Sequence, residues 1–176
     1  AIVNHLKEAG SLTIQKQLSN VIATRGYSPA FSSVMALSKS ARKEEDKATF
    51  LRAAKPLAKA ENIESILESL KETNSLGLRK VYEDTLISIL HQSPNPEKTL
   101  SIVRQRVKTS SGGERRSLFR VLGMMGGTET EKTLNRIFKG QDISKIADAI
   151  SAYYSWPNRE PIERMAELAA SENNTI

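Results

Sequence analysis

Hydrophobic residues recur along this chain with the period of an amphipathic α-helix. Apolar side chains spaced i, i+3, i+4 and i+7 form one stripe on a helix, and alternation with a period of two marks a strand. The helical spacing is found in the segments 63–70, 100–107, 134–138 and 143–150, whereas strand-like alternation is almost missing. Clusters of Gly, Pro, Ser and Asn separate such segments at short intervals. The pattern therefore predicts an all-α chain of about ten helices.

Several predicted helix starts carry side chains suited to capping. Asn95 followed by Pro96 fits an N-cap with proline at the first helical position, and Asp142 is the expected N-cap of the helix through residue 150. The segments 111–114 (Ser-Gly-Gly-Glu) and 128–131 (Thr-Glu-Thr-Glu) fit the capping box. In that motif the hydroxyl and the carboxylate each accept a hydrogen bond from a backbone amide of the first turn.

Equivalent segments recur about 34 residues apart. The tetrapeptide Glu-Lys-Thr-Leu at 97–100 returns at 131–134, and Val103 and Ile137 hold equivalent positions. Self-similarity at a fixed period marks stacked units that are each too short to bury their own apolar stripe. We therefore predict a single domain, residues 1–176, of five helix-turn-helix units and a closing helix. The predicted units are 1–26, 27–60, 61–93, 94–127 and 128–157, and the closing helix is 161–170.

The period, the short turns and the run Leu-Gly-Met-Met-Gly-Gly at 122–127 resemble HEAT repeats, especially their short bacterial variety. The resemblance covers nearly the whole chain and is most specific over residues 94–150. It implies a right-handed α-solenoid of about five stacked antiparallel helix pairs, a HEAT-like superhelix. Such scaffolds are used mainly for protein recognition and occasionally for nucleic acid. The Trp and Gly-Tyr pattern of tetratricopeptide repeats is missing from every unit.

Positive charge is concentrated in two blocks. The chain carries 26 Lys and Arg against 20 Asp and Glu, a formal net charge of +6. The excess lies in residues 26–60 and 101–125, whereas residues 61–100 are net negative, which interrupts a continuous track for nucleic acid. Solvated helix faces explain most such residues. The candidate contacts for an anion or nucleic acid are Arg52, Lys55, Arg115, Arg116 and Arg120.

Three aromatic residues gather near the end of the last predicted unit. Tyr153, Tyr154 and Trp156 are candidate partner-binding side chains, because aromatic rings with polar tips suit recognition surfaces. The alternative is that they cover the core of the last repeat beneath the closing helix. Successive residues of a helix cannot all face inward. At least one of Tyr153 and Tyr154 is therefore expected at the surface.

No catalytic or metal-binding pattern emerges from the sequence. Cysteine is absent, and His5 and His91 are far apart, each without a further ligand at helical spacing. The acidic runs 44–46 and 83–84 fit exposed ion pairs. HEAT-like proteins include DNA glycosylases that place a catalytic acid among aromatic residues, but around Asp148 the aromatic residues are too few and too localised. We therefore expect no enzymatic activity, no cofactor and no metal.

The preferred hypothesis is a non-enzymatic interaction module that binds a protein or an acidic peptide on the face lined by the second helices. The alternative is a nucleic-acid-binding HEAT-like protein that uses a basic groove. The chain starts Ala1-Ile2-Val3 without methionine, so it is also compatible with a fragment or accessory domain of a larger, even enzymatic, protein. No run of apolar residues is long enough to predict a membrane span.

Overall fold

A computed structural model describes residues 2–157 together with Ala166 and Ala170. These residues form ten α-helices and three short 3-10 segments, and no strand occurs among them. The prediction of an all-α chain is confirmed. The helices group into two compact units, Ala1–Pro94 and Asn95–Ile176. The predicted closing helix, residues 161–170, lies outside the described residues except for Ala166 and Ala170.

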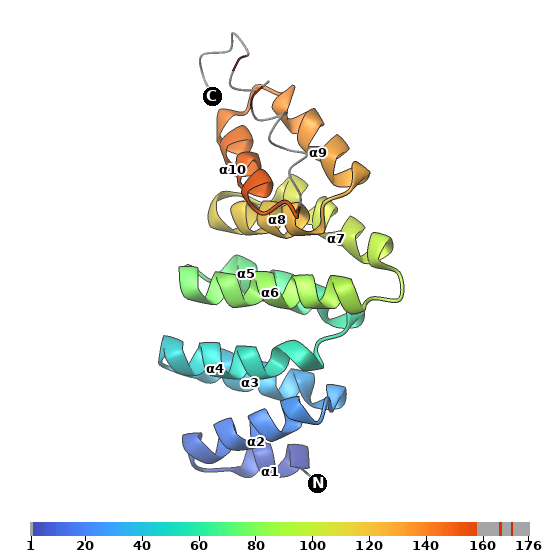
Figure 1. The fold of residues 1–176 in the computed structure, drawn as a ribbon. Helices are drawn as coiled ribbons and strands as arrows, with labels where there is room; N and C mark the ends of the chain where they lie inside the picture. Colours follow the sequence, from blue (N-terminus) through green and yellow to red (C-terminus); the bar gives the residue numbers. More distant parts are fainter. Residues whose placement is uncertain (1, 158–165, 167–169, 171–176) are drawn as a thin grey trace. The chain divides into compact units, whose positions relative to one another are not determined.

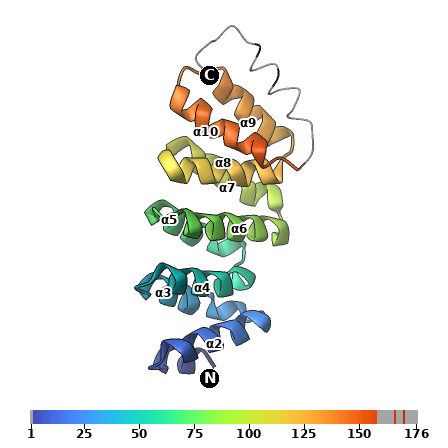
Figure 2. The same cartoon turned by 60° about the vertical axis from the view of Figure 1, so that its left-hand side comes forward.

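The first unit contains six α-helices in three consecutive pairs (Figure 1). Their bounds are α1 Ile2–Glu8, α2 Leu12–Thr24, α3 Phe31–Ser40, α4 Glu44–Ala54, α5 Ile63–Glu72 and α6 Leu76–Gln92. The 3-10 segments are η1 Ser28–Ala30, η2 Lys55–Leu57 and η3 Ala60–Asn62. Each odd-numbered helix packs on the helix that follows it, and α4 also packs between α2 and α6 (Figure 2). The second helices of the pairs are thus in direct contact with one another.

The predicted apolar stripe of α5 forms part of the core of this unit. Ile63, Ile66, Leu67 and Leu70 are all at most 2% exposed, which confirms the helical spacing read from the sequence. Phe50 and Leu51 of α4 are equally buried. Burying a Leu, Ile or Phe side chain contributes roughly 1.5–3 kcal/mol, so this layer of side chains holds the neighbouring pairs together.

The second unit contains α7 Pro96–Thr109, α8 Gly112–Met125, α9 Thr128–Phe138 and α10 Ile143–Tyr154. Helix α8 packs against the other three, most extensively against α10. The stripe predicted in α7 is buried, but the stripe predicted in α10 is only partly correct, because Ile143 is 54% exposed and Ala147 is also exposed. The buried face of α10 instead carries Ile146, Ala149 and Tyr153, since this helix also turns Asp148 inward toward α8.

Two of the predicted caps are confirmed. The side-chain oxygen of Asn95 accepts a hydrogen bond from the Lys98 amide at 3.0 Å, with Pro96 in the first turn. The Asp142 carboxylate accepts one from the Lys145 amide at 2.9 Å. Each cap satisfies a backbone donor that has no partner within its helix.

Removing the Asn95 cap should cost a measurable amount of stability. We expect Asn95→Ala to lower the free energy of unfolding by about 1 kcal/mol, because the Lys98 amide loses its acceptor. Asn95→Asp, which retains an acceptor oxygen, serves as the control. Chemical denaturation of the three proteins measures the difference, and an equal loss in both variants would contradict capping as the cause.

The two predicted capping boxes are wrong. Ser111 is the N-cap of α8 but its side chain forms no capping hydrogen bond, and the Glu114 carboxylate instead accepts from Arg106 Nε at 2.7 Å. Helix α9 already begins at Thr128, and its N-cap is Gly127 with φ of 84°. A guanidinium from the preceding helix competes successfully for Glu114, because a charge-assisted hydrogen bond is stronger than one to a neutral amide.

The acidic runs are also less exposed than expected. Glu83 is 2% exposed and Asp46 is 5% exposed, and Asp46 forms an ion pair with Lys16 of α2. Successive residues point about 100° apart around a helix, so one member of each run faces a neighbouring helix. None of the helices in the described part of the chain is long and apolar enough to cross a membrane.

Candidate functional site

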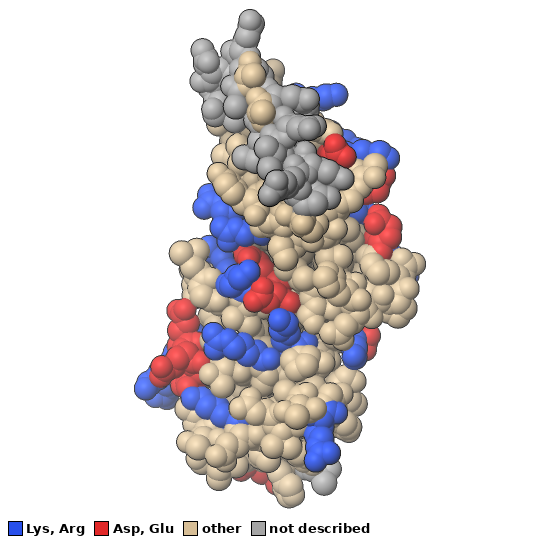
Figure 3. Space-filling view, viewed as in Figure 1, with Lys and Arg blue, Asp and Glu red and all other residues tan. Residues whose placement is uncertain are grey.

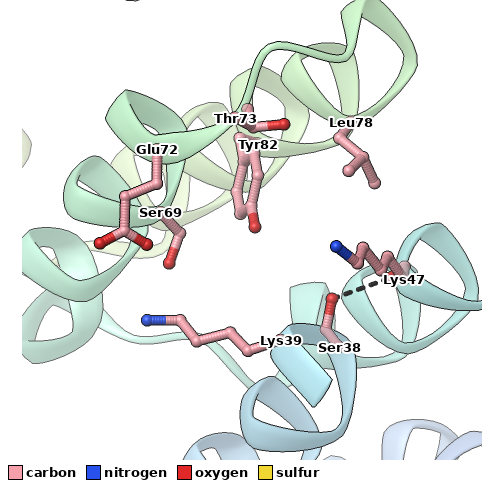
Figure 4. Close-up of a pocket in the computed structure, with 8 residues that line it drawn as sticks. All are labelled: Ser38, Lys39, Lys47, Ser69, Glu72, Thr73, Leu78 and Tyr82. Carbon is pink, nitrogen blue, oxygen red and sulfur yellow. Dashed lines mark hydrogen bonds between the residues drawn. The ribbon is translucent and has the colours of Figure 1, made fainter. Parts of the chain in front are cut away.

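A cleft in the first unit lies where the helices α3 and α4 face α5 and α6. It has a volume of about 240 Å³. Figure 4 shows eight lining residues: Ser38, Lys39, Lys47, Ser69, Glu72, Thr73, Leu78 and Tyr82. We call this site the lysine cleft, because the side chains of Lys39 and Lys47 extend along it from α3 and α4 (Figure 4).

Local structure explains how the two lysines come together. Lys39 lies in the last turn of α3, where a cation complements the helix dipole, and Lys47 lies in the first turn of α4. The Ser38 hydroxyl donates a hydrogen bond to the backbone carbonyl of Lys47 at 2.8 Å. This bond ties the end of α3 to the start of α4 and fixes the two backbone segments that carry the lysines.

Tyr82 of α6 directs its hydroxyl into the space between the two lysines (Figure 4). The side chain is only 6% exposed. Burial raises the pKa of the Tyr82 hydroxyl, the negative charge of Glu72 raises it further, and a hydrogen bond with Ser69 acts in the opposite direction. The hydroxyl therefore stays neutral and adds no negative charge to the cleft.

The lysine cleft contains more positive than negative side chains, and its two lysines, Lys39 and Lys47, have no ion-pair partner among the described residues. Glu72 lies at the end of α5 on the same cleft and supplies one negative charge (Figure 4). A second, polar hollow of about 310 Å³ continues from the cleft, shares Lys47 and Glu72 with it, and adds Arg42 and Glu44. The Ser75 hydroxyl donates a hydrogen bond to the Glu44 carboxylate.

This arrangement suits the binding of an anion. Two ammonium groups and a guanidinium face a space that contains two carboxylates, those of Glu72 and Glu44, and neutral hydroxyls, so a carboxylate ligand meets a field that is positive by one net charge. No group of three or more His, Cys, Asp or Glu that could hold a metal ion occurs among the residues that the structure describes. The lysine cleft is our candidate functional site.

The predicted contacts Arg52 and Lys55 do not line this cleft. Arg52 is exposed in the last turn of α4, and Lys55 is half-buried at the start of η2. Arg52 follows Lys47 by five residues, which separates them by roughly 140° around the helix axis. The basic residues of α4 therefore point to different faces of the unit. Figure 3 shows Lys and Arg side chains intermixed with acidic ones over α4 and α6 on the face it views.

Two of the three predicted contacts of the second unit, Arg115 and Arg116, meet Asp148 of α10. Arg115 is 8% exposed and donates from Nε to Asp148 Oδ2 at 2.8 Å and from Nη2 to the Ser144 hydroxyl at 2.9 Å. Arg116 donates from Nε and Nη2 to Asp148 Oδ1, both at 3.2 Å. Arg120 is exposed one turn further along α8. Arg115 thus serves an internal contact between α8 and α10.

The aromatic cluster divides between core and surface. Tyr153 is 7% exposed and stacks on Phe138 at a ring distance of 5.6 Å, and Trp156 lies 6.1 Å from Tyr153 in a tilted arrangement. Tyr154 is 81% exposed, which confirms that one of the two tyrosines reaches the surface. Tyr153 therefore packs inside the unit and Tyr154 lies at its surface, and the binding of a partner by these aromatic residues stays a prediction.

The sequence analysis missed Tyr82 and Glu72, and it counted Lys39 and Lys47 only as members of a basic block. A signal was present. Lys39 and Lys47 flank the turn of one predicted unit, and Glu72 and Tyr82 flank the turn of the next, about one repeat later. Stacked repeats bring equivalent turns together. Comparing residues around successive turns would have grouped these four side chains.

The comparisons with known proteins supply no relative. A scan of the sequence against protein-family models found no match, and neither did searches of curated proteins and of solved structures.

Proposed function

We propose that this chain is a non-enzymatic HEAT-like α-solenoid module that binds an acidic peptide segment of a partner protein. The lysine cleft is the binding site, and the second helices α4 and α6 contribute Lys47 and Tyr82 to it. The observation that carries the proposal is that Lys39 and Lys47 converge on one cleft without an ion pair among the described residues.

The packing of the helices supports the solenoid part of the proposal. In the first unit α4 packs against both α2 and α6, and in the second unit α8 packs against α10. Within the first unit these contacts join α2 to α4 and α4 to α6, and within the second unit they join α8 to α10. Such contacts, together with the recurrence of segments about 34 residues apart, are what stacked helix pairs require. The proposed fold is a right-handed superhelix of about five such pairs.

Electrostatics favours an acidic ligand. Two unpaired lysines repel each other across the cleft, so a carboxylate between them relieves that repulsion and gains two charge-assisted hydrogen bonds. A double-stranded nucleic acid instead needs cations along a longer path, and Figure 3 shows acidic groups among the Lys and Arg side chains over α4 and α6. The face of the first unit thus suits a short acidic segment better than a duplex.

A titration with a labelled acidic peptide tests the proposal. The probe is a short fluorescein-labelled peptide of alternating Glu and Gly, and the readout is fluorescence anisotropy. We expect the double variant Lys39→Ala/Lys47→Ala to bind it about tenfold more weakly, because each lost ion pair at a partly exposed site contributes up to about 1 kcal/mol. The expected result is a loss of affinity with an unchanged unfolding transition.

The double variant Arg52→Ala/Lys55→Ala is the charge-matched control. It removes the same net charge near the other end of α4, and we expect less than about a twofold change in affinity. Equal losses in both double variants would show that the peptide recognises net charge alone. Absence of binding to the unaltered protein would overturn the proposal. If random-sequence DNA or RNA binds more tightly than the acidic peptide, and loses that affinity between about 50 and about 200 mM salt, the nucleic-acid alternative is favoured.

A further inference from the structure

An apolar cavity lies on the opposite side of the α3–α4 turn from the lysine cleft, within the same unit. Its volume is about 330 Å³, and its apolar lining comes from Leu12 of α2, Leu37 of α3 and Phe50 of α4. Leu12 is 43% exposed, whereas Phe50 is 1% exposed and forms the floor. We call this site the Leu12 cavity. Small-molecule pockets span roughly 300–1,000 Å³, so this cavity has room for one large side chain rather than a whole cofactor.

Three of the polar side chains that line the Leu12 cavity, those of Gln15, Ser40 and Asp46, already have partners inside the protein. Gln15 Nε2 donates to the backbone carbonyl of Ala9 at 2.9 Å, and the Ser40 hydroxyl donates to the carbonyl of Leu37 at 3.2 Å. The Asp46 carboxylate is paired with Lys16. An apolar occupant therefore deprives none of these three groups of a hydrogen-bond partner, and it removes the Leu12 side chain from water.

Arg42 joins the two sites. It lines the Leu12 cavity, and it also lines the polar hollow that shares Lys47 and Glu72 with the lysine cleft. The three hollows therefore follow one another along the edge of the first unit where the turns between paired helices lie. Arg42 is exposed and forms no ion pair among the described residues. A ligand that extends from the Leu12 cavity into the polar hollow can therefore contact the Arg42 guanidinium.

We propose that the ligand is a linear peptide segment that carries a large apolar side chain within a few residues of a run of acidic side chains. The apolar side chain enters the Leu12 cavity, and the acidic run occupies the lysine cleft, with Arg42 contacting the segment between them. This inference rests on the proposed function and specifies its ligand. Charge complementarity places the acidic run on the lysine side of the cavity, because Lys39, Arg42 and Lys47, which form no ion pair among the described residues, line the lysine cleft and the hollow that joins it to the cavity.

A peptide series tests this inference. The parent probe is the labelled Glu-Gly peptide, and each further peptide has one Gly replaced by Phe at successive positions on either side of the acidic run. We expect one position, or two adjacent ones, to raise the affinity by about tenfold or more, since burial of one large apolar side chain suffices for that gain. The other positions should bind like the parent peptide.

Two variants of α2 locate the gain. Leu12→Gln is expected to abolish the advantage of the best Phe peptide and to leave the affinity for the parent peptide unchanged. Ile14→Gln is the matched control, because Ile14 is 49% exposed on the same helix and does not line the cavity. The exposure of both side chains makes either variant compatible with folding, which the thermal unfolding transition verifies.

The outcomes separate this inference from the proposed function. If the parent peptide binds in a manner that requires Lys39 and Lys47, but no Phe position adds affinity, the inference is wrong and the proposed function stands. If neither the parent nor any Phe peptide binds, both are wrong. A Phe advantage that survives Leu12→Gln also overturns the inference, because the apolar side chain would then bind elsewhere.

Discussion

Asp148→Ala is expected to destabilise the second unit by about 3–5 kcal/mol, the usual cost of removing one partner from a buried ion pair. The carboxylate accepts hydrogen bonds from both Arg115 and Arg116, and its side chain is only 4% exposed. Without it Arg115, whose side chain is 10% exposed, keeps a hydrogen bond to Ser144 but loses its counter-charge. A buried cation without a carboxylate cannot recover its hydration.

The fluorescence of Trp156 during unfolding measures the stability of the second unit, where Asp148 lies. It is the only tryptophan of the chain and lies in the second unit, 6.1 Å from Tyr153. Arg116→Ala is the matched control, since its side chain is 57% exposed and Asp148 keeps Arg115, so we expect a loss of at most about 1 kcal/mol. Similar losses in the two variants would contradict the assignment of Arg115 and Asp148 as the buried pair.

Replacing Gly123 by alanine is expected to cost about 3 kcal/mol or more. A methyl group there would come within 2.0 Å of the backbone carbonyl oxygen of Ala152 in α10. The obstacle is backbone rather than a flexible side chain, so α8 and α10 must move apart to admit it. That movement disrupts the most extensive helix contact of the second unit. In a unit of this size the expected shift of the unfolding temperature is at least roughly 12 °C.

Gly10→Ala is the control for Gly123→Ala. A methyl group at Gly10 would have no neighbour within 4 Å, and we expect no loss of stability there. Circular dichroism during heating reports both variants, and Trp156 fluorescence follows the effect of Gly123→Ala in the second unit. An unchanged transition for Gly123→Ala would show that α8 and α10 are not in such close contact.

The arginines of α8 differ in whether they can be replaced in a binding test without unfolding the second unit. The sequence offered Arg115, Arg116 and Arg120 as equivalent contacts for an anion, but the structure gives Arg115 an internal role with Asp148. A variant of Arg115 that no longer binds a ligand could simply be unfolded. Arg116 and Arg120 are exposed and can be replaced without that ambiguity, so the nucleic-acid alternative is best tested on them.

The helices themselves follow from local sequence. The stripe from Ile63 to Leu70 is buried as predicted, because helical periodicity depends only on residues a few positions apart. The caps at Asn95 and Asp142 are confirmed for the same reason, since each hydrogen bond spans three residues. The exposure of Tyr154 beside buried Tyr153 likewise follows from the angle between successive residues of one helix.

Contacts between side chains of different helices could not be predicted from the helical spacing of the sequence. The capping box predicted at Ser111 fails because Arg106 of the preceding helix takes Glu114. Asp148 and Arg115 are 33 residues apart, and the sequence does not state that their side chains meet across α8 and α10. The apolar stripe of α10 is shifted for the same cause, because a buried ion pair occupies part of the face that periodicity assigned to apolar residues.

The sequence by itself determined that the chain is helical, where α7 and α10 begin, and that neighbouring segments repeat about every 34 residues. Only the tertiary structure decided which charged side chains are paired internally and which remain available. Lys39 and Lys47 look like any other lysines in the sequence, and they become a candidate site because the turns of two helix pairs place them around Tyr82. The physical reason is that periodicity is set within one helix, whereas pairing and burial of charge depend on the distance between helices.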